Sequence, residues 1–156
     1  YRIQIWDTSG SDAFKSVTGA YYKNIVCVLI AYDITNKETF NHLDSWIEDC
    51  EKLCPKTVYK ILIGNKVDLE NRRQVTFEEG KNFADKYKLD FYETSAKTGK
   101  NINEIFLNST IKIDKKIFEG YYNLDDKECG GCGIERGLSS KKNNASKKKK
   151  AKNFCA

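Results

Sequence analysis

Short apolar segments alternate along the chain with segments of helical spacing. Residues 1–6 alternate apolar and polar side chains, which is the pattern of a strand with one buried face. Residues 25–31 and 58–63 are continuous apolar runs rich in Val and Ile, and such short runs predict buried parallel strands. A fourth, weaker strand is predicted over residues 91–94.

The intervening segments predict amphipathic helices. Between residues 40 and 54, apolar side chains recur at spacings of three and four. Thr76 and Glu79 form a capping-box pattern, which predicts a helix that runs to about residue 87. Asn101 and Glu104 predict a further helix start of the same kind. The predicted apolar face of that helix consists of Ile102, Ile105, Phe106, Ile113 and Ile117.

This alternation predicts an α/β fold with a mostly parallel sheet and flanking helices. In such sheets, ligands bind at the carboxyl ends of the strands. We therefore expect the chemistry of the protein just after residues 6, 31, 64 and 94.

Composition is consistent with one packed domain followed by a tail. The 156 residues are 40% hydrophobic and 31% charged. The longest apolar stretch, residues 25–32, has the length of a strand, so no membrane span is predicted. The chain begins with Tyr1 and shows no signal-peptide pattern, and we interpret it as a piece of a longer protein.

The net charge of +5 belongs entirely to the C-terminal part. Residues 1–120 hold 18 basic and 18 acidic side chains, and residues 121–156 hold nine and four. Seven lysines lie between positions 141 and 152. We predict a domain over residues 1–119 and a flexible basic tail over 120–156, which is either simply solvated or attracted to an anionic membrane. No aromatic residues interleave with these lysines, so nucleic-acid binding is not expected.

Five of the six cysteines fall into two groups. Cys27, Cys50 and Cys54 are predicted to be small core residues, because they lie in an apolar strand and on a helix face. Cys129 and Cys132 have CxxC spacing, but no second ligand pair follows and the one His is distant. We therefore do not predict a metal site there.

Three motifs follow the predicted strands. They read Asp7-Thr8-Ser9-Gly10, Asn65-Lys66-Val67-Asp68 and Ser95-Ala96-Lys97. In this order and at these strand ends, they resemble the signatures of Ras-superfamily small GTPases. The Trp before Asp7, together with Tyr21-Tyr22, Tyr32-Asp33-Ile34-Thr35 and Phe77-Glu78-Glu79-Gly80, resembles the Rab branch. The resemblance runs from Tyr1 to about Phe118 and implies the P-loop NTPase-type fold.

The resemblance implies a guanine site whose chemistry the residues support. The Asp68 carboxylate suits the two N–H donors on one edge of guanine and rejects adenine. The Asn65 amide is expected to contact the base and to tie neighbouring loops together, with Ser95 holding its loop in place. The Ala96 N–H is expected to reach the guanine oxygen. The remaining expectation is that the aliphatic stems of Lys66 and Lys97 cover the two faces of the base.

The phosphate side of the site is expected from the first motif. By resemblance, Asp7 holds Mg²⁺ through water, and Thr8 and Gly10 lie at the phosphates of GTP or GDP. Ser11 stands where the family has the Gln that orients the attacking water, so hydrolysis is expected to be very slow. No GxxxxGK[ST] loop occurs in the 156 residues, and the first switch is also missing. Nucleotide binding is therefore expected to be weak, and unpaired strand edges are expected to lower stability.

Two functions remain open at this stage. The first is a Rab-like GTP-binding switch in vesicle traffic, with effector, exchange and GTPase-activating partners, on the cytosolic face of endomembranes. Cys155 is then the candidate for prenylation, although the ending Asn153-Phe154-Cys155-Ala156 is neither a double Cys nor a CaaX box. The second is a degenerate, non-cycling GTPase piece that acts as a binding module or has no function.

Overall fold

A parallel sheet of three strands forms the centre of the structure, a computed structural model that describes residues 2–8, 22 and 25–122. The strands are β1 (Cys27–Asp33), β2 (Tyr59–Asn65) and β3 (Asp90–Glu93), in the order β1-β2-β3. Both pairings are parallel, with Ala31 beside Ile63 and Ile63 beside Tyr92. The predicted α/β fold with a parallel sheet is confirmed.

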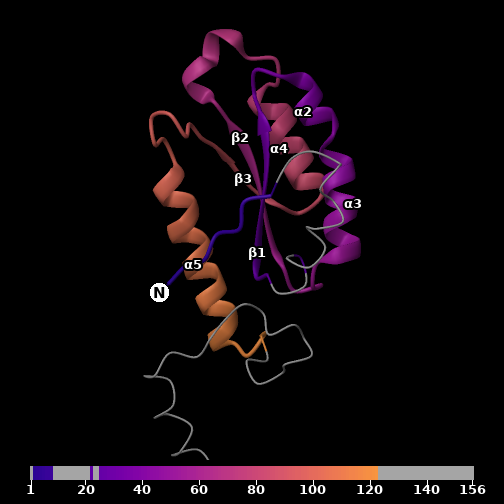
Figure 1. Ribbon diagram of the computed structural model, residues 1–156, viewed down its shortest axis with the longest axis vertical. Coiled ribbons are helices and arrows are strands. Elements are labelled where there is room, and N and C mark those ends of the chain that lie inside the picture. Colours follow the sequence, from indigo (N-terminus) through magenta and orange to yellow (C-terminus); the bar gives the residue numbers. More distant parts are fainter. Residues whose placement is uncertain (1, 9–21, 23–24, 123–156) are drawn as a thin grey trace, which may run out of the picture.

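Helices cover both faces of the sheet. Figure 1 shows α2 (Lys37–Asn41), α3 (Leu43–Leu53) and α4 (Phe77–Lys86) on one side and α5 (Ile102–Phe118) on the other. A 3-10 helix, η2 (Val67–Arg72), follows β2. Within the described residues, no helix is both long enough and apolar enough to cross a membrane.

Alternation along the strands sends side chains to two separate cores. In β2, Leu62 joins the larger core under α3 and α4, whereas Ile61 and Ile63 face α5 and pack with Ile105. These side chains are almost completely buried, and each contributes about 1.5–3 kcal/mol of burial free energy. On α5, the predicted apolar face is confirmed as the less exposed face.

The capping box predicted at residue 76 is confirmed. The Thr76 hydroxyl accepts a hydrogen bond from the Glu79 N–H at 3.2 Å, and the Glu79 carboxylate accepts one from the Thr76 N–H at 2.8 Å. Two backbone donors at the start of α4 are thereby satisfied. The helix ends at Lys86, one residue from the predicted position.

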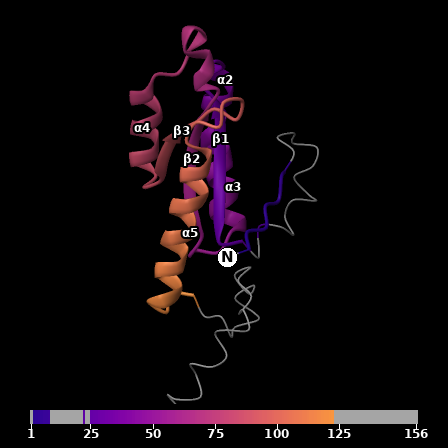
Figure 2. The same cartoon turned by 90° about the vertical axis from the view of Figure 1, so that its left-hand side faces the viewer.

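The strand predicted over residues 1–6 is wrong for the part that the structure describes. Residues 2–8 form no strand, and Figure 2 shows them running outside the sheet. Ile3, Ile5 and Trp6 are 52%, 65% and 54% exposed. A strand requires a hydrogen-bonded neighbour, and within the described sheet β1 pairs only with β2.

Two helix predictions also need correction. The pattern over residues 40–54 belongs to two helices, because the chain turns at His42, whose N–H closes α2 by donating to the Glu38 carbonyl at 3.1 Å. Asn101 precedes α5 but forms no side-chain cap. Its backbone is left-handed, with φ of 60°, and its amide instead donates to the Glu93 carbonyl at 2.7 Å.

Candidate functional site

The loops that follow β2 and β3 are joined at the carboxyl edge of the sheet. The Thr94 N–H donates to the Gly64 carbonyl at 2.8 Å, and the Val67 N–H donates to the Thr94 carbonyl at 3.0 Å. These bonds continue the parallel ladder past the end of β3. Two of the three predicted motif segments are therefore adjacent in space, as expected from the carboxyl ends of neighbouring strands.

Asn65 links the two loops through its side chain. Its Oδ1 accepts one hydrogen bond from the Thr94 hydroxyl and one from the Ala96 N–H, both at 3.2 Å. The structure thus shows the loop-tying contact expected of Asn65. The same contact engages the Ala96 N–H, so binding of a carbonyl oxygen there requires this N–H to be shared or exchanged.

Ser95 and Asp68 form the most buried polar contact of the site. Ser95 is completely buried, and its hydroxyl donates to Asp68 Oδ1 at 2.6 Å while accepting from the Thr98 N–H at 3.1 Å. Asp68 itself is half-buried. Its Oδ2 has no hydrogen bond or ion pair with any residue that the structure describes. The carboxylate is therefore held at one oxygen and retains acceptor capacity at both.

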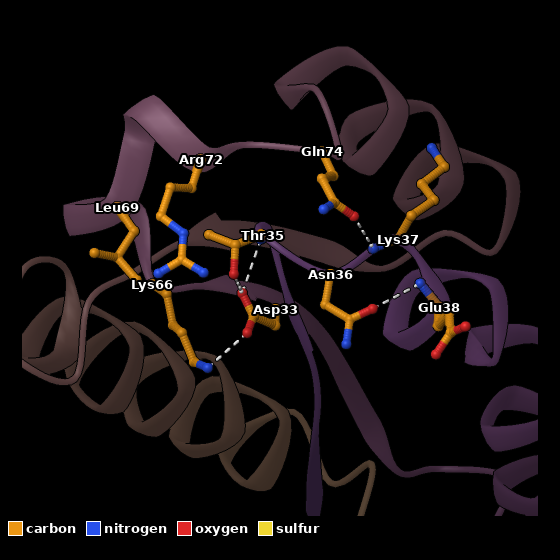
Figure 3. Close-up of a pocket in the computed structure, with 9 residues that line it drawn as sticks. All are labelled: Asp33, Thr35, Asn36, Lys37, Glu38, Lys66, Leu69, Arg72 and Gln74. Atoms are coloured by element: carbon orange, nitrogen blue, oxygen red, sulfur yellow. Dashed lines mark hydrogen bonds and ion pairs between the residues drawn. The ribbon is translucent and has the colours of Figure 1, made fainter.

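Lys66 directs its charge toward the end of β1. Its backbone is left-handed, with φ of 72°, and its Nζ lies 2.6 Å from Asp33 Oδ2. Asp33 Oδ1 accepts hydrogen bonds from the N–H and hydroxyl of Thr35, at 2.8 and 2.7 Å (Figure 3). Burial opposes ionisation, but the hydrogen bonds from Lys66 and Thr35 lower the pKa of Asp33 below its usual value.

Asp33 was not among the predicted site residues. The sequence placed it just after a strand end where chemistry was expected, but assigned it no role. Its place directly after the apolar run 25–31 was the sequence signal that pointed to it, and the register opposite Asn65 became visible only in the structure. The ammonium group of Lys66 is therefore paired with Asp33. The sequence analysis had assigned a role only to the aliphatic part of this side chain, at the face of a base.

An open polar hollow of about 550 Å³ lies beside the Lys66–Asp33 ion pair (Figure 3). It is lined by Asp33, Thr35, Asn36, Lys37, Glu38, Lys66, Leu69, Arg72 and Gln74. Lys66 is the member of the predicted base-binding set that lines it. Neither Ser95 nor Asp68 lines the hollow, so we define the candidate site by its hydrogen bonds and not by this hollow.

Arg73 joins η2 to the end of β3, next to the candidate site. The sequence analysis did not identify it. Its guanidinium forms two bonds to Glu93, at 2.6 and 2.9 Å, and two to Glu70, at 2.6 and 2.7 Å. It also donates to the Val75 carbonyl at 2.8 Å. Hydrogen bonds to Glu70 and Glu93 raise the pKa of Arg73 above its usual value. These contacts fix the end of β3 directly before Thr94 and Ser95.

The other predicted residues are exposed or lie outside the described chain. Lys97 is exposed in the loop after β3, and Asp7 and Thr8 are exposed in the irregular N-terminal segment. Gly10, Ser11 and Cys155, like Cys129 and Cys132, fall outside the described residues. In the described ranges, no three potential metal ligands gather in one place.

Comparison with known proteins finds a family model and a relative that match most of the chain. A family model described as "Ras family" matches residues 1–115. The Ras-related protein Rab-2B of Dictyostelium discoideum is 51% identical over 116 residues, which cover 74% of this chain and 57% of that protein. The chain thus spans little more than half the length of this curated relative.

Proposed function

The chain belongs to the Ras family of small GTPases and is Rab-like, and on this premise we propose that it carries the base-reading half of a guanine-nucleotide switch. Its parallel sheet and flanking helices fit the P-loop NTPase-type fold of that family. The proposed base contacts are Asp68, Asn65 and Ala96, with Lys66 and Lys97 at the faces of the base and Ser95 as the support.

The Ser95–Asp68 hydrogen bond is the observation that carries this proposal. Guanine offers N1–H and the N2 amino group on one edge, and a carboxylate accepts both with charge-assisted bonds. Ser95 fixes Asp68 through Oδ1, at 2.6 Å, and the fixed orientation lowers the entropy lost on binding. Adenine presents an acceptor at N1, so the same carboxylate would be left facing a lone pair.

Saturation-transfer NMR with guanosine and adenosine tests base reading directly, since it detects weak binding and needs no phosphate cradle. We expect stronger saturation of guanosine, and loss of that preference in Asp68→Asn. Asp85→Asn is the matched control, because Asp85 is an exposed acid on α4 that pairs with Lys81. Equal saturation of both nucleosides by the unchanged chain would reject the proposal.

Mg²⁺ is part of the proposal through Asp7. A single exposed carboxylate fits an ion that takes most of its ligands from phosphate oxygens and water. When bound, such an ion neutralises phosphate charge. Thr8 and Gly10 are proposed to lie beside the same phosphates.

Slow hydrolysis is proposed from Ser11. A Ser side chain is too short to orient a water as the family's Gln does. Because no GxxxxGK[ST] loop occurs in the 156 residues, the test joins this chain to a Ras-family N-terminal segment that carries the loop. In that chimera, Ser11→Gln should raise single-turnover GTP hydrolysis, and an unchanged rate would contradict this explanation.

A non-cycling binding module is the second candidate, favoured by Ser11 at the position of the family's Gln. Titration of the chain with fluorescent GDP and ATP, with and without Mg²⁺, tests whether these residues form a working switch. Tight, guanine-selective and Mg²⁺-dependent binding supports such a switch. Weak binding of GDP fits either a piece of a longer switch or a module that does not cycle, and the coding sequence upstream of Tyr1 then decides between them by whether it holds GxxxxGK[ST].

The remaining elements of the proposal concern the domain division and location. We propose a GTPase domain over residues 1–119 and a basic tail over 120–156, peripheral to the cytosolic face of endomembranes. Each tail lysine near an anionic surface adds about 1 kcal/mol of attraction. A lipid on Cys155 would complete a two-part anchor. Effector, exchange and GTPase-activating proteins are the proposed partners, and mass spectrometry of native protein tests the lipid.

A further inference from the structure

Two thiols lie together at the C-terminal end of α3. Cys50 is 3% exposed within the larger core, and Cys54 is the half-buried residue that caps the helix. The Cys54 N–H donates to the Cys50 carbonyl at 3.0 Å, so the two side chains are one helical turn apart on the same face. Both cysteines are free thiols.

The pair is chemically asymmetric. A hydrogen bond from the Cys50 thiol lowers the pKa of Cys54, burial opposes this shift, and the nearby Lys60 charge assists it. The same hydrogen bond raises the pKa of Cys50. The negative end of the α3 dipole also disfavours a thiolate at Cys54, so Lys60 is the cation that offsets it. Cys54 is thus the better nucleophile of the two.

Cys27 provides a contrast within the same chain. Burial raises the pKa of its thiol to about 12, and the neighbouring Asp90 carboxylate acts in the same direction. Cys27 and Cys54 are both half-buried free thiols, so Cys27 serves as the reference thiol whose pKa is raised.

A small hollow opens onto the Cys50–Cys54 pair. Its volume is about 180 Å³, which is ample for a small oxidant. It is lined by Cys50, Glu51, Cys54, Pro55, Lys56 and Lys60. The site lies at the end of α3 and is independent of the candidate nucleotide site and of the function proposed for it.

We propose that Cys54 is a peroxide-reactive thiol and that Cys50 resolves its oxidised form as an intramolecular disulfide. The Cys54 thiolate attacks one oxygen of hydrogen peroxide, forming an S–O bond and releasing hydroxide, which takes up a proton to give water. The Cys50 sulfur then attacks the sulfenic sulfur of Cys54. An S–S bond forms, and the sulfenic oxygen leaves with the Cys50 proton as a second water.

Bond formation requires a small movement at the helix end. Residues four apart on a helix have Cβ atoms about 5–6 Å apart, whereas a disulfide needs about 3.5–4.5 Å. Cys54 is the last position of the turn and already has an extended backbone, with φ of −86° and ψ of 155°. The closure therefore disturbs only the last turn of α3 and the Cys54–Cys50 backbone hydrogen bond.

Peptide mapping of the full 156-residue chain tests the proposal. After limited hydrogen peroxide, remaining thiols are alkylated and the protein is digested with trypsin, which cuts between Lys52 and Leu53. We expect a disulfide between peptides 38–52 and 53–56, formed about tenfold faster than any oxidation of Cys27. The same treatment in urea should remove the difference, because the folded environment creates it. Equal rates in the folded chain, or no such cross-linked peptide, would overturn the proposal.

Variants assign the two roles. In Cys50→Ala, a sulfenic acid should persist at Cys54 and react with dimedone, and in Cys54→Ala, no dimedone adduct should form at Cys50. Lys60→Gln should slow oxidation several-fold. Lys56→Gln is its matched control, since Lys56 lines the hollow but does not shift the Cys54 pKa. A dimedone adduct at Cys50 instead of Cys54, or equal effects of the two lysine variants, would contradict the assigned mechanism.

Discussion

The Ser95 hydroxyl donates a 2.6 Å hydrogen bond to the Asp68 carboxylate across two loops that are 27 residues apart in sequence. Ser95 is completely buried and Asp68 half-buried, so the contact joins the loop after β3 to η2. A hydrogen bond to a charged group in such surroundings contributes about 1.5–3 kcal/mol. The contact therefore supports the fold and the orientation of the candidate base-reading carboxylate together.

Ser95→Ala should lower the free energy of unfolding by about 1.5–3 kcal/mol, because Asp68 and the Thr98 N–H both lose a partner. Urea unfolding monitored by circular dichroism measures the change. Ser45→Ala is the matched control, since it removes one exposed hydrogen bond to the His42 carbonyl and should cost about 0.5 kcal/mol or less. Equal losses in the two variants would show that the Ser95–Asp68 contact adds no stability.

Tyr32→Phe should leave stability unchanged or raise it by up to about 1 kcal/mol. The Tyr32 side chain is 2% exposed, and its hydroxyl has no hydrogen-bond partner among the described residues. Removing an unsatisfied buried hydroxyl removes its desolvation penalty. Tyr122→Phe is the control with a partner, because the Tyr122 hydroxyl donates to the Thr57 carbonyl at 3.2 Å, and it should lose about 1 kcal/mol. A clear loss in Tyr32→Phe would contradict the structure at this position.

Gly80→Ala should destabilise the protein although Ala favours helices. An added Cβ would meet the Tyr32 hydroxyl and lie 2.6 Å from Cζ of Phe91. Overpacking costs about 1–3 kcal/mol, and with two contacts to aromatic side chains below 3.0 Å we expect a cost above the gain of about 1 kcal/mol in helix propensity. Thermal unfolding should show a lower Tm. The double variant with Tyr32→Phe should recover part of the loss, and a stabilised Gly80→Ala would show that the two rings move aside.

Local patterns in the sequence were sufficient for much of this architecture. The three described strands, the Thr76–Glu79 capping box and the buried face of α5 each depend on residues close in sequence. The helix start predicted at Asn101 is confirmed, but its side-chain cap is wrong, because the Asn101 backbone is left-handed and its amide donates to the Glu93 carbonyl instead. The strand over residues 1–6 was wrong because strand formation depends on a neighbour, which no local pattern supplies.

The residues of the candidate site also divide into those that the sequence predicted and those that it missed. Three predicted residues lie at or just after strand ends, namely Asn65, Asp68 and Ser95. The carboxyl ends of neighbouring parallel strands lie at one edge of the sheet, so their proximity follows from the predicted fold. Asp33 and Arg73 were missed because their importance lies in partners 33 and 20 residues away, Lys66 and Glu93. Pairing of charges at that separation requires the register and the left-handed turn at Lys66, and neither follows from composition or periodicity.

The lowered pKa of Glu79 predicts how the free energy of unfolding falls at acid pH. Its carboxylate pairs with Lys37 and accepts bonds from the N–H and hydroxyl of Thr76, in that order of effect, and its pKa falls from 4.5 to about 2. A depressed folded-state pKa contributes stability above the unfolded value and loses it as pH falls through the folded value. Stability should therefore decline between pH 4.5 and about 2. The side chain is 43% exposed, so solvent screening keeps the effect well below what the shift alone implies.

Glu79→Gln should flatten this part of the pH profile, because the amide keeps acceptor capacity for Thr76 but does not titrate. Urea unfolding at intervals from pH 5 down to pH 2 measures the slope for each variant. Glu78→Gln is the matched control: Glu78 is the adjacent exposed acid on the first turn of α4, so its removal should leave the slope unchanged. If Glu79→Gln keeps the slope of the unchanged chain, the acid sensitivity comes from other carboxylates, and the Lys37–Glu79 pair adds no measurable stability.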